Sequence, residues 1–124
     1  MSTTCKQERL EDNLRKVMIH GKLDAPSTMA IEKELRTMLL EEPDQIIVDL
    51  SGVDYMSSYG LRLLLICAKA LQDSKGGLHL AGANQRVMEI ITMAGYDTLF
   101  PVYETVEDAL LALTGKAPGL QHLK

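Results

Sequence analysis

One stretch of the sequence limits the fold more than any other. Residues 45–53, QIIVDLSGV, hold a continuous apolar run instead of an alternation of apolar and polar side chains. Such a run is typical of a strand that is buried on both of its faces, as the inner strands of parallel sheets are. We therefore expect this segment to be a central strand of a sheet.

The segments around this strand alternate between strands and helices. We predict strands over residues 17–23, 45–53, 78–81 and 100–103, and helices after Pro26, over residues 58–73, around residues 87–94 and after Thr105. The last strand is an edge strand, because Pro101 cannot donate a ladder hydrogen bond. The N-terminal stretch is a candidate for one further strand.

This alternation predicts the fold class. Strands that are joined by helical crossovers pair in parallel, so we expect one α/β domain with a mostly parallel sheet of four to five strands and about four helices. The domain spans residues 1–124, with a core over about residues 10–114 and a loose tail over residues 115–124. A chain of 124 residues is long enough to build one such core without disulfides or metal.

Charge and composition exclude several classes of function. The net charge is −4 and the basic residues are scattered singly, whereas a nucleic-acid surface needs clustered Lys and Arg. The first fourteen residues are polar and contain no apolar signal-peptide core, and the longest uncharged apolar run is too short to span a bilayer. Cys5 and Cys67 stand alone and are expected to be reduced thiols. We expect a cytoplasmic protein without membrane insertion.

Polar side chains interrupt the chain where the central strand meets the next helix, in the stretch DYMSSYGLRLLL over residues 54–65. Ser57 or Ser58 is expected to cap the helix by accepting amide hydrogen bonds of its first turn. A helix N-terminus also carries free amides and the positive end of the helix dipole. A phosphate on a serine here would be held without unfolding the domain, and it would change what docks there.

An enzymatic role for these serines is a remote alternative. A serine-hydrolase turn of the form G-x-S-x-G needs small residues on both sides, and Met56 occupies the first of these positions around Ser58. His20, His79 and His122 are isolated and lack metal-ligand spacing. We therefore expect no catalytic residue, no metal and no cofactor, and regard the chain as a non-enzymatic protein.

The helix after the junction has two distinct faces. At about 100° per residue, Leu61, Leu64, Ala68 and Leu71 form a buried stripe. Tyr59, Arg62 and Ile66 lie on the opposite side, with Leu63 at the margin. Exposed apolar and aromatic residues beside a cap serine indicate a protein-binding surface.

At these residues the sequence resembles the STAS domain family, and within it the bacterial anti-sigma factor antagonists. The junction is similar to the family's D-S-[ST]-G-L signature. Three further stretches agree in order and spacing over residues 10–114: the G-K-L-D of residues 21–24, the I-I-V-D-L-S-G-V of residues 46–53, and L-F-P-V-Y-E-T-V-E-D-A-L-L-A-L over residues 99–113.

The resemblance implies a protein that binds an anti-sigma factor which is also a serine kinase with a histidine-kinase-like ATPase fold. That kinase phosphorylates the loop serine and so weakens binding, and a PP2C-type phosphatase reverses the reaction. Matched by position, Ser58 is the phosphoacceptor and Asp24 lies at the kinase-facing surface. The expected partner-binding residues are Asp24, Met56, Ser57, Tyr59, Arg62, Leu63 and Ile66.

The sequence departs from the family pattern at two positions. Ser57 replaces the usual Asp, and Tyr59 replaces the usual Ser or Thr. Ser57 is therefore an alternative phosphoacceptor, one residue away from Ser58. The alternative function is that of a STAS scaffold or sensor module without a phosphoswitch, in a signalling complex or as a subunit of lipid-transport machinery.

Overall fold

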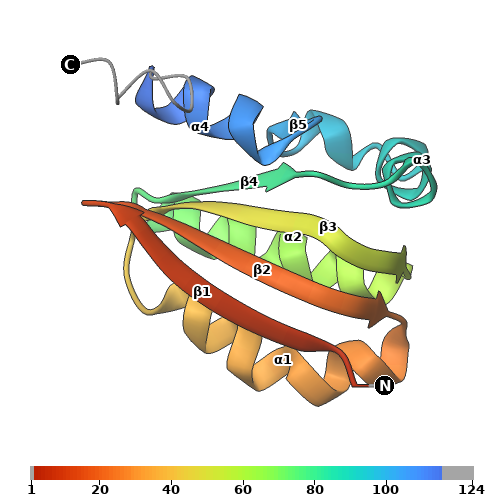
Figure 1. The fold of residues 1–124 in the computed structure, drawn as a ribbon. Coiled ribbons are helices and arrows are strands. Elements are labelled where there is room, and N and C mark those ends of the chain that lie inside the picture. The colour runs from red at the N-terminus through yellow and green to blue at the C-terminus, as the bar shows by residue number, and fades with distance from the viewer. Residues whose placement is uncertain (1, 116–124) are drawn as a thin grey trace.

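The computed structural model describes residues 2–115 and shows an α/β domain built on one five-stranded sheet (Figure 1). The strands are β1 (Thr4–Glu11), β2 (Leu14–Leu23), β3 (Gln45–Met56), β4 (Gly77–Ala81) and β5 (Val102–Tyr103), and they lie in the sheet in this order. β1 runs antiparallel to β2, and the remaining neighbours are parallel. The predicted α/β class with a mostly parallel sheet is confirmed.

Four strand boundaries differ from those predicted. β3 continues to Met56 instead of ending at residue 53, and β4 begins at Gly77 instead of residue 78. β2 begins at Leu14, three residues before the predicted start, because it pairs with β1 in a hairpin that closes near Asn13. The edge strand β5 contains only Val102 and Tyr103, since Pro101 contributes its carbonyl to Leu80 and has no N–H to extend the ladder. Of the predicted tail, only Gly115 lies within the described residues.

Residues 2–115 contain four α-helices, which connect or follow the strands: α1 (Ala25–Leu40), α2 (Ser58–Asp73), α3 (Gln85–Met93) and α4 (Val106–Thr114). A short 3₁₀ helix, η1 (Tyr96–Thr98), follows α3. α1 and α2 lie side by side against one face of the sheet (Figure 1). None of the helices in residues 2–115 combines the length and the apolar character that crossing a membrane requires.

The central strand is buried on both faces, as its sequence predicted. Ile46, Ile47 and Val48 are all fully buried. Ile46 and Val48 pack into the main core with α1, α2 and α3. Ile47 points to the opposite face, where it packs with Ala81 and with Ala109 of α4. Because successive side chains of a strand alternate between faces, an unbroken apolar run serves both cores.

Each of the four α-helices in residues 2–115 has an N-cap residue whose side-chain oxygen accepts a hydrogen bond. This oxygen accepts a backbone N–H three residues later in every case, from Asp24 in α1, Ser57 in α2, Asn84 in α3 and Thr105 in α4. These caps satisfy amides that have no partner within the helix. The caps of α1 and α2 follow the carboxyl ends of β2 and β3, so they lie at the same edge of the sheet.

A buried ion pair joins the β1–β2 hairpin to the loop before β3. The Arg15 Nε lies 2.7 Å from Asp44 Oδ2, and both side chains are only 3% exposed. Arg15 also donates to the carbonyls of Met38 and Glu42, at the end of α1 and in the loop that follows. Arg9 of β1 completes the cluster at 3.1 Å from the same Asp44 oxygen.

Candidate functional site

The candidate site is the junction between β3 and α2, and it is held against the end of β2. The Leu23 carbonyl accepts two hydrogen bonds from Ser57, one from its N–H at 2.9 Å and one from its hydroxyl at 2.8 Å. Leu23 pairs with Met56 in the β2–β3 register. These contacts place Asp24, the next residue after Leu23, beside the junction.

The Ser57 hydroxyl is built into this junction. It donates to the Leu23 carbonyl and accepts the Gly60 N–H at 3.2 Å, so it uses both of its hydrogen-bonding capacities within the fold. Ser57 is half-buried and takes an extended conformation, with φ −87° and ψ 168°, as expected of an N-cap. Of the two candidates left open by the sequence, Ser57 is therefore the cap.

Ser58 has a different environment. It is the first residue of α2, and its side chain is exposed. Within residues 2–115 its hydroxyl has no hydrogen-bond partner. The first intrahelical hydrogen bond of α2 is donated by the Leu61 N–H to the Ser57 carbonyl, so the N–H groups of Ser58 and Tyr59 come before the first intrahelical donor. A free hydroxyl thus stands beside two helix-terminal amides.

Gly60 allows α2 to approach the end of β2 closely. A Cβ at this position would lie 3.0 Å from Leu23 Cβ, 3.1 Å from the Leu23 carbonyl oxygen and 3.3 Å from Thr28 Oγ1. Contacts this short with backbone and packed side chains force a displacement. The glycine of the signature is therefore a packing requirement of the junction.

The outward side of α2 carries the exposed residues that the helical phase predicted. Tyr59 is 37% exposed, Ile66 is 43% exposed and Arg62 is exposed. The Tyr59 hydroxyl donates to Glu32 Oε1 at 3.0 Å, and this hydrogen bond to a carboxylate raises the pKa of the phenol. Glu32 in turn accepts from Arg36 at 3.1 Å, so Tyr59 is fastened to α1.

α1 adds one residue to this surface that the sequence reasoning missed. Met29 lies in the first turns of α1 and is 56% exposed. Ile31, Leu35 and Leu39 form the buried apolar stripe of α1, and Met29 is out of phase with it. The sequence signal that could have revealed it is an isolated apolar residue on the polar face of a predicted amphipathic helix. We refer to Tyr59, Arg62, Ile66 and Met29 together as the α1–α2 face.

Two predicted partner-binding residues are buried and cannot contact a partner directly. Met56 is fully buried and Leu63 is 4% exposed, and both belong to the main core. Met56 ends β3 on the face that the helices cover. Leu63 is buried because α2 packs against α1 as well as the sheet, which makes its buried face wider than one stripe. Ala68, predicted to lie inward, is only partly buried.

Asp24 is partly exposed, but its carboxylate is engaged in capping. Hydrogen bonds from Ser27, through its side chain and through its N–H, lower the pKa of the Asp24 carboxyl. The N–H bond is 2.9 Å long, and the Lys22 ammonium lies 3.5 Å from the second carboxylate oxygen. Asp24 therefore presents a fixed negative charge next to the serines.

Within residues 2–115, neither junction serine is paired with a histidine. The His79 ring contacts Gln45 Oε1 through Nε2 at 2.8 Å and the Tyr103 hydroxyl through Nδ1 at 3.4 Å. Burial lowers the pKa of His79. His122 lies outside the described residues. No hydroxyl–imidazole hydrogen bond involving Ser57 or Ser58 occurs in residues 2–115.

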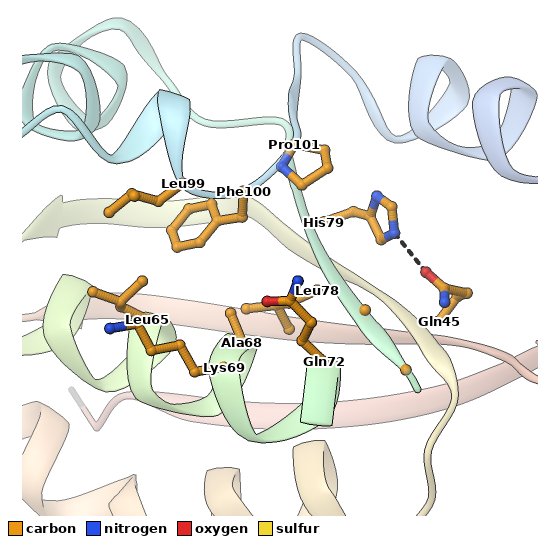
Figure 2. Close-up of a pocket in the computed structure, with 12 residues that line it drawn as sticks. Gln45, Leu65, Ala68, Lys69, Gln72, Leu78, His79, Leu99, Phe100 and Pro101 are labelled. Carbon is orange, nitrogen blue, oxygen red and sulfur yellow. Dashed lines mark hydrogen bonds between the residues drawn. The ribbon is translucent and has the colours of Figure 1, made fainter. Parts of the chain in front are cut away.

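A separate groove lies along the second half of α2 (Figure 2). It has a volume of about 390 Å³ and runs between α2, β4 and the segment before β5. Its lining includes Leu65, Gln72, Leu78 and Phe100, with Lys69 as the one charged lining residue among those described. Neither Ser57 nor Ser58 lines this groove, so it is distinct from the junction.

Comparison with known proteins identifies the family. The model of the STAS domain matches residues 7–109. The chain belongs to the STAS domain family. This STAS domain is 30% identical over 96 residues to the anti-sigma-B factor antagonist of Staphylococcus epidermidis, covering 77% of this chain and 89% of that protein. It is 29% identical over 98 residues to the anti-sigma-F factor antagonist RsfB of Mycobacterium tuberculosis, covering 78% and 79%.

Solved structures agree with this assignment. A crystal structure of an anti-sigma factor antagonist from Mycobacterium paratuberculosis superposes with a TM-score of 0.78 at 28% identity. The match covers 90% of this STAS domain and 93% of that chain. The family-level prediction is therefore confirmed.

Proposed function

We propose that this STAS domain is an anti-sigma factor antagonist that acts by docking, without catalysis of its own. The observation that carries the proposal is the exposed Ser58 hydroxyl, free of hydrogen bonds in the described residues, at the edge of the α1–α2 face. The names of the relatives support the same function. The partner is an anti-sigma factor that is also a serine kinase with a histidine-kinase-like ATPase fold.

We infer that this kinase phosphorylates Ser58. The Ser58 oxygen attacks the γ-phosphorus of ATP, the bond to the leaving ADP breaks, and the hydroxyl proton passes to solvent or to a base of the kinase. A PP2C-type phosphatase hydrolyses the resulting ester. Ser58 is the better acceptor of the two serines, because the Ser57 hydroxyl would have to release its bonds to Leu23 and Gly60 first.

A phosphate on Ser58 would act on docking and leave the domain folded. The ester stands at the N-terminus of α2, where free amides and the helix dipole favour negative charge. It adds nearly two negative charges beside Tyr59, on the face that also carries Ile66, and an apolar partner patch cannot solvate them. The partner-binding residues in this account are Asp24, Ser57, Tyr59, Arg62, Ile66 and Met29.

Binding to the purified anti-sigma factor tests this proposal. Protein carrying phosphoserine at position 58 should bind about thirtyfold to a thousandfold more weakly than unmodified protein. Ser58→Asp should show part of the loss, since it carries one charge and fewer acceptor oxygens. Ser58→Ala is the matched control and should bind like wild type. Equal affinity of all four proteins would instead favour the STAS scaffold or sensor module without a phosphoswitch.

A further inference from the structure

We propose that Arg62 is the residue that holds a phosphate carried by Ser58, and that this pairing withdraws its positive charge from the α1–α2 face. The inference rests on the proposed modification of Ser58. It concerns a contact specific to this sequence, between the first residue of α2 and the residue one helical turn later.

The geometry of α2 brings the two side chains together. Ser58 and Arg62 are separated by four residues within one continuous helix. Residues at this spacing lie about 40° apart around the helix axis, with Cβ atoms roughly 5–6 Å apart. An extended guanidinium reaches a phosphate on the neighbouring turn from this distance, and its planar fork matches two phosphate oxygens.

Arg62 is available for this contact. It is exposed, and it makes no ion pair or hydrogen bond with any residue in the described range 2–115. The nearby acceptor on α1 is already in use, because Glu32 accepts from both Tyr59 and Arg36. Among the described residues, Arg62 of α2 therefore has no competing partner, whereas Arg36 of α1 is paired with Glu32.

A phosphate on Ser58 would also lie near the backbone N–H groups at the start of α2, which carry partial positive charge. The N–H groups of Ser58 and Tyr59 begin α2 and precede its first intrahelical hydrogen bond. Amides at the start of the helix and a guanidinium one turn along would thus surround the phosphate. This arrangement fixes the phosphate over α2 and turns it toward Arg62.

This pairing gives phosphorylation a second consequence. In the unmodified protein Arg62 lies between Tyr59 and Ile66 on the exposed side of α2, and it offers a cation to an acidic group of the partner. Phosphorylation neutralises that cation in the same step that adds negative charge. The partner surface is therefore expected to combine an apolar patch with a carboxylate that faces Arg62.

The test uses full-length protein with phosphoserine incorporated at position 58 during synthesis, so it requires no kinase. Unfolding by urea is followed by circular dichroism for phosphorylated and unmodified protein, each as wild type, Arg62→Gln and Lys69→Gln. The last variant removes one exposed positive charge from the same helix, two turns beyond Arg62. A second readout is the ¹⁵N resonance of Arg62 Nε, which a change in global stability alone would not move.

The expected result is a coupling that is specific to Arg62. Phosphate should raise the folded-to-unfolded ratio about threefold or more in wild type relative to Arg62→Gln. Lys69→Gln should keep the wild-type effect of phosphate, and the Arg62 Nε resonance should shift on phosphorylation. An equal effect of phosphate in both variants, with an unshifted resonance, overturns the inference.

The two proposals fail in different ways. If phosphoserine at position 58 still weakens binding to the anti-sigma factor but shows no coupling to Arg62, this inference is wrong and the phosphoswitch stands. If the coupling is present but phosphorylated and unmodified protein bind equally, the phosphate–Arg62 contact stands and the phosphoswitch is wrong.

Discussion

At the scale of single residues, two neighbouring serines have different environments. The Ser57 hydroxyl donates to the Leu23 carbonyl and accepts the Gly60 N–H. The Ser58 hydroxyl has no hydrogen-bond partner within the described residues. The sequence presented the two as equivalent candidates for the cap. Only the three-dimensional position of the Leu23 carbonyl, which is distant in the sequence, distinguishes them.

This difference predicts unequal costs for two conservative substitutions. Ser58→Ala should lower the free energy of unfolding by no more than about 1 kcal/mol, because it removes no hydrogen bond of the fold. Ser57→Ala should cost about 1–2 kcal/mol, because it removes a helix cap and leaves the Gly60 N–H without its acceptor. Chemical denaturation of both variants measures these free energies of unfolding. A larger loss of stability in Ser58→Ala than in Ser57→Ala would contradict the assignment of Ser57 as the cap.

Whether Gly60→Ala stabilises or destabilises the protein tests how closely α2 packs on the end of β2. In an ordinary exposed helix position, Gly→Ala stabilises by about 1 kcal/mol. At Gly60 the added Cβ would lie 3.0–3.1 Å from atoms of Leu23. Gly60→Ala is therefore expected to destabilise by about 1–3 kcal/mol in denaturation experiments. A stabilised variant would mean that α2 does not pack closely on the end of β2.

At the scale of elements, α2 separates residues that hold the fold from residues that meet a partner. Ile66→Asp should change stability by no more than about 0.5 kcal/mol, because the side chain is exposed. It should nevertheless abolish binding to the anti-sigma factor by placing a charge in the interface.

Leu63→Asp is the matched comparison, three residues earlier in α2. Its side chain is 4% exposed, so an aspartate there should cost several kcal/mol and unfold much of the protein at equilibrium. Thermal unfolding of both variants separates the roles. Unfolding of Ile66→Asp, or a stable Leu63→Asp protein, would show that the helical phase is wrong.

Element-scale prediction from the sequence succeeded where local chemistry determines structure. The range 58–73 for α2 follows from a cap serine, an apolar stripe and the glycines after it. Leu63 was misplaced because periodicity does not report how many neighbours a helix has, and α2 packs on both α1 and the sheet. β1 was indistinct because TCKQERLE has no apolar alternation, and its ordering depends on backbone pairing with β2.

At the scale of the whole molecule, the buried Arg15–Asp44 pair fastens the hairpin to the helical layer. Burial alone would raise the pKa of Asp44, but hydrogen bonds from Arg15 and Arg9 outweigh it, so the pKa lies below its ordinary value of 3.8. A carboxyl whose pKa is lowered in the folded state stabilises the protein at pH values above its ordinary, unfolded-state pKa. This contribution is lost as pH falls through the folded-state pKa.

We therefore expect the protein to lose stability steeply below about pH 4. Asp44→Asn should cost about 3–5 kcal/mol at neutral pH, because it leaves Arg15 buried without its counter-charge. That variant should also lose less stability than wild type below pH 4. Asp73→Asn, at the exposed end of α2, is the control and should retain the acid sensitivity. Parallel pH profiles for wild type and Asp44→Asn would contradict this account.

Phosphoryl transfer to the protein shows whether Ser58 is a phosphorylated switch residue. Purified protein is incubated with its ATPase-fold kinase and labelled ATP, as wild type, Ser58→Ala and Ser57→Ala, with the labelled position mapped by mass spectrometry. We expect label on wild type and Ser57→Ala, and none on Ser58→Ala. Label that persists on Ser58→Ala and vanishes on Ser57→Ala would place the acceptor one residue earlier. Absence of label from all three proteins would contradict the switch itself.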